Sequence, residues 1–546
     1  MRNTRMIILG VTHPISWNNA ACILVDGQLV AMAEEERFNR IKHAPRMAPT
    51  LAIEFCLQEA NVTLADVDYV AIGFDTALDT ATQNITKLRN IAGVRNAAQW
   101  FYQISTYGRT LPLEGIPAER IVYVNHHQAH AASAFFASGF EEANILSLDG
   151  SGGSESGILA VGRGAQIEVL KTVSNGGSWG LMYELITEII GFRRHSGEGK
   201  TMGLAAYSTP DPAGLPFIDW DADIPTIDPA KRKKYISELA NGKELSWEER
   251  QKLAATTQAS LERAGSRMSE WLYEQTGIRN LCLAGGSALN CSMNGILAKL
   301  PWVDNIFIQP AAHDAGTALG AALQVFTEKT GRRPQWEMLH AYWGAEYDNE
   351  EIQHALQECP AISYHLSDNI FAETAQLLAE DKIVGWFQGR FEVGPRALGN
   401  RSILANPANP DMKDLINKKV KGREPWRPFA PSILAEEIGR YIDDPVPSRF
   451  MILAFQTRPE TMDEIVSAVH VDGTCRPQTV HQETNPRYWE LIKAFMERTG
   501  IPAVLNTSFN VDSQPIVNTP AEAIDTFLNS GLDILAIGDF IATKNK

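Results

Sequence analysis

The sequence predicts an α/β protein built from two domains, and two observations support this prediction. Apolar runs typical of strands alternate with helical stretches along the 546 residues, a pattern typical of α/β folds. A turn-rich segment, GRRPQWEMLHAYWG at 331–344, then interrupts the alternation. We therefore expect a first domain over residues 1–340 and a second α/β domain over residues 345–546.

The composition is that of an ordinary globular protein and excludes several classes. Hydrophobic residues make up 44% and charged residues 21%, which disfavours a disordered, collagen-like or coiled-coil chain. The net charge of −16 disfavours a non-specific nucleic-acid binder, because such proteins present a basic face. The six cysteines lack CxxC spacing, so we expect free thiols. No apolar run is long enough for a membrane span, and we expect a cytoplasmic protein without membrane or nucleic-acid partners.

Residues 6–32 and 144–170 share one pattern of three strands. Each has an apolar strand, a polar turn, a second strand, a tight turn containing glycine (Gly27 and Gly164) and a third strand. A repeat about 140 residues apart predicts two related halves in the first domain. The actin-like and sugar-kinase ATPases use this layout, and each of their halves supplies a phosphate-facing turn. Two unrelated meanders would look the same, so the pattern alone leaves the duplication open.

Two helices are predicted with particular clarity. Residues 49–60 begin with a proline, which suits the first helical position, and carry apolar residues at helical spacing. Residues 315–328, AGTALGAALQVFTE, form a second helical stretch shortly before the expected domain boundary.

The segment NHHQAH at 125–130 follows the strand-like run IVYV. In a helix, His126 and His130 share one face because they are four residues apart. Two histidines at this spacing form half of a transition-metal site, and Asp149 and Asp314 are the candidate oxygen ligands. Such a set suits iron, zinc or manganese. The alternative is that the histidines are capping or core residues.

Three glycine-rich segments are candidates for nucleotide contact. They are LDGSGG at 148–153, GEGKTMG at 197–203 and LAGGSALN at 283–290. Glycine after a strand lets backbone N–H groups approach phosphate. None matches a P-loop or a Rossmann fingerprint, and each alone is often only a turn. Together with the repeated meander they favour a nucleotide site.

A basic stretch follows in the second domain. Arginines in WFQGRFEVGPRALGNRS (386–402) and in the segment ending at Arg427 are flanked by Phe, Trp, Gly and Pro. Arginine binds phosphate with two parallel hydrogen bonds, and lysine adds a point charge. Lys418, Lys419 and Lys421 also fit a solvated helix face, whereas Arg390, Arg396 and Arg427 do not. We therefore predict an anion pocket.

These segments together resemble the O-carbamoyltransferase family of antibiotic and nodulation-factor biosynthesis. The matching pieces occur in the family's order and span nearly the whole chain. They are AEEERFNRIKH (33–43), HHQAH (126–130), LDGSGG (148–153), GEGKTMGLAAY (197–207), LAGGSALN (283–290), FEVGPRALGNRS (391–402), VKGREPWRPFAPS (420–432), DGTCRPQTV (472–480) and NTSFN (506–510).

The resemblance implies a two-step reaction in two domains. The first domain is similar to tRNA threonylcarbamoyl-transferring ATPases, with a duplicated actin-like fold and a bound metal, usually Fe2+. The second is similar to threonylcarbamoyl-adenylate synthases. There, carbamoyl phosphate and ATP, expected with Mg2+, would give carbamoyl-adenylate, and phosphate and pyrophosphate would leave. In the first domain a hydroxyl of a small-molecule natural product would then take the carbamoyl group, which makes the protein a transferase of one-carbon groups.

By motif match, the resemblance also implies roles for individual residues. His126, His130, Asp149 and Asp314 would hold the metal. Arg396 and Lys421 would be catalytic in the second domain. The full set implied to bind carbamoyl phosphate and the nucleotide is Arg396, Lys421, Arg427, Arg476, Ser508, Gly285, Gly286 and Asn290.

One position departs from the family pattern. Family members carry a His-Asp stretch after the first strand, and this histidine is the base for the acceptor hydroxyl. Trp17 and Asn18 stand there instead, and His13 lies four residues earlier. We expect His13 to serve as the base, or the base to lie elsewhere in the chain.

Two other functions share parts of this pattern. A tRNA threonylcarbamoyl-type transferase has both domain types, but the net charge of −16 disfavours a tRNA substrate. An actin-like sugar kinase would use only the first domain and would leave the basic stretch unexplained. The identity of the acceptor stays open, and so does the oligomeric state, with a homodimer among the alternatives.

Overall fold

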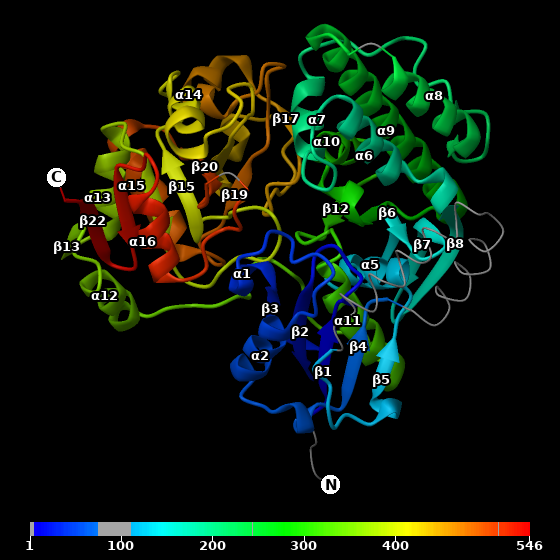
Figure 1. The fold of residues 1–546 in the computed structure, drawn as a ribbon, viewed down its shortest axis with the longest axis horizontal. Helices are drawn as coiled ribbons and strands as arrows, with labels where there is room; N and C mark the ends of the chain where they lie inside the picture. The colour runs from blue at the N-terminus through cyan, green and yellow to red at the C-terminus, as the bar shows by residue number, and fades with distance from the viewer. Residues whose placement is uncertain (1–4, 75–110, 243, 512, 546) are drawn as a thin grey trace. The chain divides into compact units, whose positions relative to one another are not determined.

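The computed structural model describes residues 5–74, 111–242, 244–511 and 513–545. The chain divides into two compact units, Met1–Met338 and Leu339–Lys546, both drawn in Figure 1. We call them unit 1 and unit 2 and describe each by itself. The division falls inside the turn-rich segment 331–344.

The first half of unit 1 is a five-stranded sheet. Its first three strands form an antiparallel meander, and the first strand also pairs in parallel with the fourth. The strand order is β3-β2-β1-β4-β5. The strands are β1 (Ile7–Val11), β2 (Ala20–Val25), β3 (Gln28–Glu34), β4 (Tyr69–Ile72) and β5 (Ile121–Tyr123).

The second half of unit 1 repeats this topology. Read from the other edge, its order is β8-β7-β6-β11-β12, again with an antiparallel meander whose first strand pairs in parallel with the fourth. Two halves of one topology form the duplicated actin-like fold, so the predicted duplication and fold class are confirmed. The strands are β6 (Glu142–Gly152), β7 (Glu155–Arg163), β8 (Gln166–Ser174), β11 (Asn280–Ala284) and β12 (Asn305–Ile308).

The tight turn of the first meander is the expected Asp26-Gly27, and that of the second lies one residue later than the expected Arg163-Gly164. In the first, Asp26 and Gly27 both have positive φ, 52° and 80°, as a two-residue hairpin turn requires. In the second, Arg163 still pairs with Gln166, so the turn consists of Gly164 and Ala165.

Helices cover both sheets of unit 1. The predicted helix over 49–60 is present as α2 with Pro49 at its N-cap, and the one over 315–328 extends to Thr330 as α11. The helices are α1 (Glu36–Asn39), α2 (Thr50–Glu59), α5 (His126–Phe135), α6 (Trp179–Ile189), α7 (Glu198–Ala205), α8 (Pro229–Asn241), α9 (Trp247–Thr276), α10 (Cys291–Leu297) and α11 (Gly316–Thr330). Short elements are η1 (Leu64–Asp66), η2 (Ala118–Arg120), η3 (Asn175–Gly177), η4 (Gly286–Leu289), β9 (Ile218–Asp219) and β10 (Thr226–Ile227).

Helices α5 and α11 pack against each other with almost no space between their backbones. A Cβ added to Gly320 on α11 would lie 1.7 Å from the carbonyl oxygen of Ala129 on α5. Each helix follows the last strand of its half, β5 or β12. The two halves of unit 1 therefore meet at these two helices.

Unit 2 is built on an eight-stranded mixed sheet of order β13-β22-β21-β14-β15-β20-β16-β19. Its strands are β13 (Ile362–Leu366), β14 (Val384–Phe387), β15 (Arg401–Ala405), β16 (Ala430–Leu434), β19 (Gln478–Val480), β20 (Ala503–Ser508), β21 (Ile534–Ile537) and β22 (Phe540–Lys544). A small sheet adds β17 (Phe455–Gln456) and β18 (Thr474–Cys475).

The helices of unit 2 form two layers around this sheet. Buried residues of α12, α14 and α16 share one hydrophobic cluster with the strands. Those of α13 and α15 share a second cluster. This is an α/β/α arrangement, as predicted for the second domain. The elements are α12 (Asn349–Gln357), α13 (Ile370–Ala379), α14 (Met412–Ile416), η5 (Asn417–Lys421), η6 (Ala435–Arg440), η7 (Pro459–Ala468), α15 (Pro486–Thr499) and α16 (Pro520–Leu528).

Two chain-wide predictions can be compared with the structure. All six cysteines are free thiols, as expected. Within the described ranges, no helix combines the length and the apolar character that crossing a membrane requires.

Candidate active site

Helix α5 places two histidines on one face. Asn125 is its N-cap, and the side-chain oxygen of Asn125 accepts hydrogen bonds from the backbone N–H groups of His127 and Gln128. The helix therefore begins at His126, and His130 follows one turn later. Both rings are buried, with 3% and 0% of their surface exposed.

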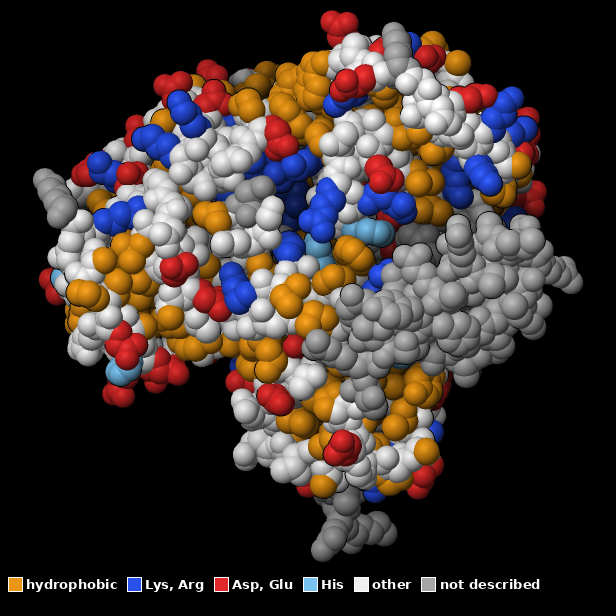
Figure 2. Space-filling model, viewed as in Figure 1, with side chains coloured by type: hydrophobic (Ala, Val, Ile, Leu, Met, Phe, Trp, Pro, Cys, Tyr) orange, Lys and Arg blue, Asp and Glu red, His pale blue; other side chains and the backbone are white. Residues whose placement is uncertain are grey.

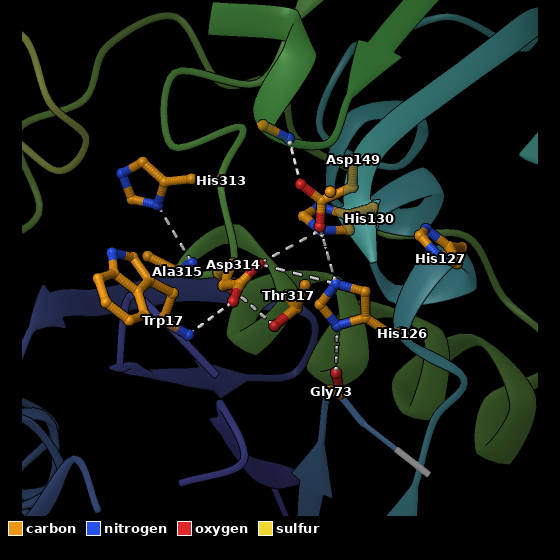
Figure 3. A network of polar contacts seen from close by, with 12 residues as sticks. Trp17, Gly73, His126, His127, His130, Asp149, His313, Asp314, Ala315 and Thr317 are labelled. Atoms are coloured by element: carbon orange, nitrogen blue, oxygen red, sulfur yellow. Dashed lines mark hydrogen bonds and ion pairs between the residues drawn. The ribbon is translucent and has the colours of Figure 1, made fainter. Parts of the chain in front are cut away.

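The structure brings together the four predicted metal ligands (Figure 3). We call His126, His130, Asp149 and Asp314 the His/Asp cluster; one potential ligand atom from each lies within 4.8 Å of the others. Nε2 of His126 is 3.2 Å from Oδ2 of Asp149 and 3.7 Å from Oδ1 of Asp314. Nε2 of His130 is 3.6 Å from the same Asp149 oxygen and 3.2 Å from Nε2 of His126. Two imidazole nitrogens and two carboxylate oxygens converge on one point.

The pKa shifts within the cluster favour the binding of a cation. Burial opposes ionisation of Asp149, yet its hydrogen bonds to His126 and His130 hold its pKa well below the usual range. Burial lowers the pKa of His130, so this ring favours the neutral form that binds metals. Burial also disfavours charge on His126, but the bond from Asp149 and the charge of Asp314 raise its pKa. The two-nitrogen, two-oxygen donor set fits a first-row divalent metal.

Backbone groups from distant segments orient the cluster. Nδ1 of His126 lies 3.3 Å from the carbonyl oxygen of Gly73. The N–H of Gly286 donates to Oδ1 of Asp149 at 3.0 Å, and the N–H of Trp17 donates to Oδ2 of Asp314 at 2.8 Å. Such contacts fix ligand geometry and tune a bound metal. Sequence reasoning missed the role of Trp17, because a backbone N–H leaves no signature in residue type.

His127 and His13 lie outside the cluster. Burial lowers the pKa of His127 to about 3, and its ring is T-shaped to that of His126. The ring of His13 packs on Phe74, with centroids 5.9 Å apart, and Nδ1 of His13 accepts a hydrogen bond from the N–H of Ile15 at 3.1 Å. Burial lowers the pKa of His13 to about 4. His13 is therefore a neutral imidazole, and its role as the base stays a prediction.

Of the three glycine-rich segments, one has the predicted geometry. Residues 283–290 form a turn after β11, in which Gly285 has φ of 82° and approaches the backbone of Leu148. The other two segments lie largely in regular elements, and their contact with a nucleotide stays a prediction. Residues 148–152 continue strand β6 through a bulge, and residues 198–203 belong to helix α7.

Asn290, a predicted nucleotide ligand, is already engaged in the structure. Its side-chain amide exchanges two hydrogen bonds with that of Gln258, at 2.9 and 2.8 Å, and its oxygen caps helix α10. The hydroxyl of Tyr183 adds a third bond to Gln258, at 2.8 Å. Nucleotide contact by Gly285, Gly286 and Asn290 remains a prediction.

In unit 2, the strand topology gathers the predicted anion-binding residues at one edge of the sheet. β15 and β16 both run antiparallel to β20, and β16 runs parallel to β19. The beginnings of β15, β16 and β19 therefore lie at the same edge as the end of β20. The predicted residues stand just before these beginnings or at that end, and we call them the cationic edge: Arg396, Lys421, Arg427, Arg476 and Ser508.

The contacts of Lys421 at the cationic edge correct the interpretation that it could lie on a solvated helix face. Lys418 and Lys419 are exposed, but Lys421 is buried with 4% of its surface exposed, so Lys421 does not belong to a solvated face. Its Nζ donates to the carbonyl oxygens of Ser508 and Asn510, at 2.5 and 2.9 Å. The five-residue π-helix η5 turns Lys421 inward.

The arginines of this region serve different purposes. Nε of Arg476 is buried and has no hydrogen-bond partner within the part of the chain that the structure describes, whereas Arg427 lies 3.8 Å from Glu424. Arg390 donates to the carbonyl oxygen of Trp343 at 3.3 Å. Arg401 is fully buried, and its guanidinium lies 3.6 Å from the centre of the Phe387 ring. Arg401 therefore stabilises the loop between β14 and β15 and does not bind a ligand.

Comparison with known proteins identifies the family. The model of the carbamoyltransferase N-terminus matches residues 7–323, and that of the carbamoyltransferase C-terminus matches residues 375–544. The chain belongs to the carbamoyltransferase family. The resemblance inferred from the sequence motifs is thereby confirmed, as is the assignment of the protein as an enzyme of this family.

Relatives of this carbamoyltransferase include nodulation proteins. NolNO of Sinorhizobium fredii is 38% identical over 562 residues, covering 98% of this chain and 80% of the relative. NolO of Bradyrhizobium diazoefficiens is 41% identical over 437 residues, covering 77% of this chain and 79% of the relative. The uncharacterized protein sll1178 of Synechocystis is 37% identical, and the aligned region covers 96% of this chain and 95% of sll1178.

Two solved structures show distant similarity to this carbamoyltransferase. Full-length HypF in the phosphate- and nucleotide-bound form is 14% identical, with a TM-score of 0.38 over 61% of this chain and 56% of HypF. The ROK hexokinase of Thermus thermophilus is 15% identical, with a TM-score of 0.29 over 58% of this chain and 98% of the hexokinase. At this level neither supports a statement about activity.

Proposed function

We propose that this carbamoyltransferase uses ATP to move the carbamoyl group of carbamoyl phosphate, through carbamoyl-adenylate, to a hydroxyl of a small-molecule natural product. The observation that carries the proposal is the presence of two sites of opposite character. Unit 2 gathers cationic side chains at one sheet edge, and unit 1 encloses a buried His/Asp cluster. A cationic edge suits phosphate chemistry, and a metal-type cluster suits group transfer.

In the proposed first step, unit 2 binds carbamoyl phosphate and ATP. Arg396, Arg427 and Arg476 would neutralise phosphate oxygens, and Lys421 would place a fixed ammonium beside Ser508. The buried Nε of Arg476, which has no partner within the described residues, supports this because it offers a donor to an anion. Water cleaves carbamoyl phosphate to carbamate and inorganic phosphate, and a carbamate oxygen then attacks the α-phosphorus of ATP as pyrophosphate leaves. Adenylation gives the carbamoyl carbon a good leaving group.

In the proposed second step, unit 1 transfers the carbamoyl group. His126, His130, Asp149 and Asp314 would hold a divalent metal, for which we propose Fe2+. A metal bound there supplies a Lewis acid next to the reacting carbonyl and the departing phosphate. The N–H groups of Trp17 and Gly286 keep the two carboxylates in place. Gly285, Gly286 and Asn290 would face the nucleotide, and His13 is the base expected from sequence.

The two alternative functions explain less of the molecule. A tRNA substrate calls for a basic surface, but the net charge is −16, and acidic and basic side chains are interspersed on the described part of the face in Figure 2. A sugar kinase would use unit 1 alone and would leave the cationic edge without a role. ATP turnover that depends on carbamoyl phosphate, rather than on threonine with bicarbonate or on a sugar alone, distinguishes the three.

The test separates the two steps by mutation. In Lys421→Met and Arg427→Ala, pyrophosphate release without acceptor should fall about 30- to 1,000-fold, because each loses a charge-assisted contact worth roughly 2 to 4 kcal/mol. Lys418→Met, which removes an exposed lysine three residues away, is the matched control and should leave release unchanged. His126→Ala should still release pyrophosphate but form no carbamoylated acceptor. The opposite pattern would show that the two units have exchanged roles.

The acceptor is found by mass spectrometry. The purified chain with ATP and carbamoyl phosphate is offered aminosugars, macrolides, cephalosporin-like alcohols and alkaloid alcohols. The product gains one carbamoyl group in place of a hydrogen. If pyrophosphate release never depends on carbamoyl phosphate, the proposed function is wrong.

A further inference from the structure

His195 lies beside the His/Asp cluster without belonging to it. Its imidazole packs against the indole of Trp17 in a tilted arrangement, with ring centroids 4.2 Å apart and an angle of 32° between the planes. Trp17 is the residue whose backbone N–H donates to Asp314. One residue therefore separates the imidazole of His195 from a predicted metal ligand.

A carboxylate orients this imidazole. Nδ1 of His195 lies 3.3 Å from Oε1 of Glu184 on α6. The same Glu184 oxygen borders the strand that carries Asp149, since a Cβ added to Gly150 would lie 3.0 Å from it. Glu184 is further held by Arg194, at 3.2 Å from Oε2. The ring is thus fixed at Nδ1, and Nε2 has no hydrogen-bond partner among the residues that the structure describes.

The backbone at His195 is held in an unfavourable conformation. Its φ is 62°, a left-handed value that costs a residue with a Cβ about 1 kcal/mol or more. The backbone N–H of His195 donates to Oε1 of Glu198 at 2.8 Å, which keeps the residue in place at the start of α7. Strain of this kind concentrates at functional sites, and here it directs an imidazole toward Trp17.

The indole of Trp17 adds a second sign that a ligand binds here. Its Nε1 is buried and has no hydrogen-bond partner within the described residues. An indole N–H is only a donor, and buried donors of this type are almost always paired. The hydroxyl oxygen of an acceptor substrate that stacks against Trp17 would accept a hydrogen bond from this Nε1–H.

The other imidazoles of this region are less suited to move a proton. Burial lowers the pKa of His13 and of His43 to about 4 in each case. His43 contacts the side chain of Asn18 at 2.9 Å, and Nδ1 of His13 accepts from Ile15. The side chain of His195 is 37% exposed, so it can meet a substrate and return its proton to water.

We propose that His195 is the general base of the transfer step, a proposal that rests on the proposed function. Nε2 of His195 takes the proton of the acceptor hydroxyl as the hydroxyl oxygen bonds to the carbamoyl carbon. The bond from that carbon to the phosphate oxygen of AMP breaks, and AMP leaves with the bonding electron pair. Glu184 is a positioning residue that fixes the ring, and the proton later passes from His195 to water.

The charges around His195 set the direction of its pH dependence. The groups that face it are Glu184 from α6, Arg194 from the segment before α7 and Glu198, the first residue of α7. The hydrogen bond that the imidazole donates to Glu184 raises the pKa of His195 above the usual value, against a smaller opposing effect of burial. The base form is present above that pKa, so the rate of transfer should fall as the pH drops through it. Without Glu184 the fall should shift to lower pH.

The test uses water and hydroxylamine as probe nucleophiles, so it does not require the natural acceptor. In His195→Asn, which tolerates a left-handed backbone, the first burst of carbamoyl-phosphate-dependent pyrophosphate should match wild type. AMP formation with water as the nucleophile should fall about 100- to 10,000-fold, and hydroxylamine, which needs no base, should restore it. Retained metal content and the intact burst show that the variant is folded.

Two further variants complete the test. Glu184→Gln should keep part of the activity and move the acidic limb of its pH profile to lower pH, which a purely structural role would not do. His354→Asn removes another histidine beside a glutamate, an exposed side chain of α12 that lies 3.8 Å from Glu358, and should behave as wild type.

The contrary results are equally definite. Wild-type AMP formation and pH profile in His195→Asn would overturn the proposal, and so would an equal loss with water and hydroxylamine. If His13→Asn flattens the pH profile and His195→Asn does not, the base is His13. Absence of carbamoyl-phosphate-dependent pyrophosphate in the wild-type chain would instead contradict the proposed function.

Discussion

The two halves of unit 1 share one topology but contribute different chemistry to the His/Asp cluster. The first strand of the second half, β6, runs into Asp149, whose carboxylate belongs to the cluster. The corresponding strand of the first half, β1, leads into a loop that contributes only the backbone N–H of Trp17. The duplicated fold thus provides equivalent positions in the two halves, and the residue type at each position determines whether its side chain contributes to the cluster.

The helices of the two halves, in contrast, contribute alike. His126 begins α5 after the last strand of the first half, and Asp314 stands two residues before α11 after the last strand of the second. Both positions are at helix beginnings, and both bring a proposed metal ligand to the same point. The cluster therefore depends on both halves of unit 1. This dependence can be tested by replacing one cluster residue from each half.

The largest expected effect is loss of the metal. His130→Ala removes a ligand of the first half and Asp149→Ala one of the second, and each should weaken metal binding more than about 100-fold, because a four-donor site loses a direct ligand. His127→Gln, on the same helix but outside the cluster, should keep the metal. Elemental analysis of the purified variants gives the metal content. If only the histidine variant loses metal, the second half adds no ligand and the comparison fails.

The next effect concerns the contact between the halves. In Gly320→Ala, the new methyl group would lie 1.7 Å from the carbonyl oxygen of Ala129, so α5 and α11 must move apart. We expect a loss of about 3 kcal/mol in the stability of unit 1 together with a lower metal content. Urea unfolding followed by circular dichroism measures the first. Gly199→Ala is the control, since among the described residues no atom outside its own stretch of helix lies within 4 Å of its added Cβ; equal stability of the two variants would contradict the close approach.

The smallest effect concerns the third strands of the meanders. β3 is largely buried and is followed by Glu35, which is 3% exposed, whereas β8 is mostly accessible and ends at Ser174. Burial raises the pKa of Glu35 to about 7 from 4.5, although its carboxylate accepts a bond from the N–H of Ala52. Since the folded pKa lies above the unfolded one, Glu35 increasingly opposes folding as the pH rises from 4.5 to 7.

Glu35→Gln should therefore stabilise unit 1 by about 2 kcal/mol at pH 8 and have little effect at pH 4. Thermal unfolding of the variant and wild type at both pH values measures the difference. Ser174→Ala removes the hydroxyl that caps η3, and its cost should not change with pH. A gain for Glu35→Gln that is equal at both pH values would show that the pKa of Glu35 is the same in the folded and the unfolded chain.

The sequence predicted the fold and the cluster where residue type and spacing determine the structure. The repeated meander, helix α5 and the four residues of the cluster follow from strand patterns and from the four-residue spacing of His126 and His130. Backbone contributions could not be predicted in this way. The N–H of Trp17 meets Asp314 across 297 residues, and only the folded chain brings them together.

Three local features could not be predicted from the sequence. The glycines of 148–152 suggested a turn, but a bulge keeps them within β6. Lys421 follows two exposed lysines, and a π-helical turn reverses the direction in which its side chain points. His195 gave no signal because its left-handed backbone and its contact with Trp17 depend on packing between α6, α7 and the loop after β1.

The spacing of the ligands along the chain has a consequence for folding. His126 and Asp314 are about 190 residues apart, so an ion held between them closes a long loop. In the unfolded chain, joining two points at that distance removes about 4 to 5 kcal/mol of conformational freedom. An ion at this point would act on unit 1 as a reversible crosslink, and a chelator would reverse it without breaking a covalent bond.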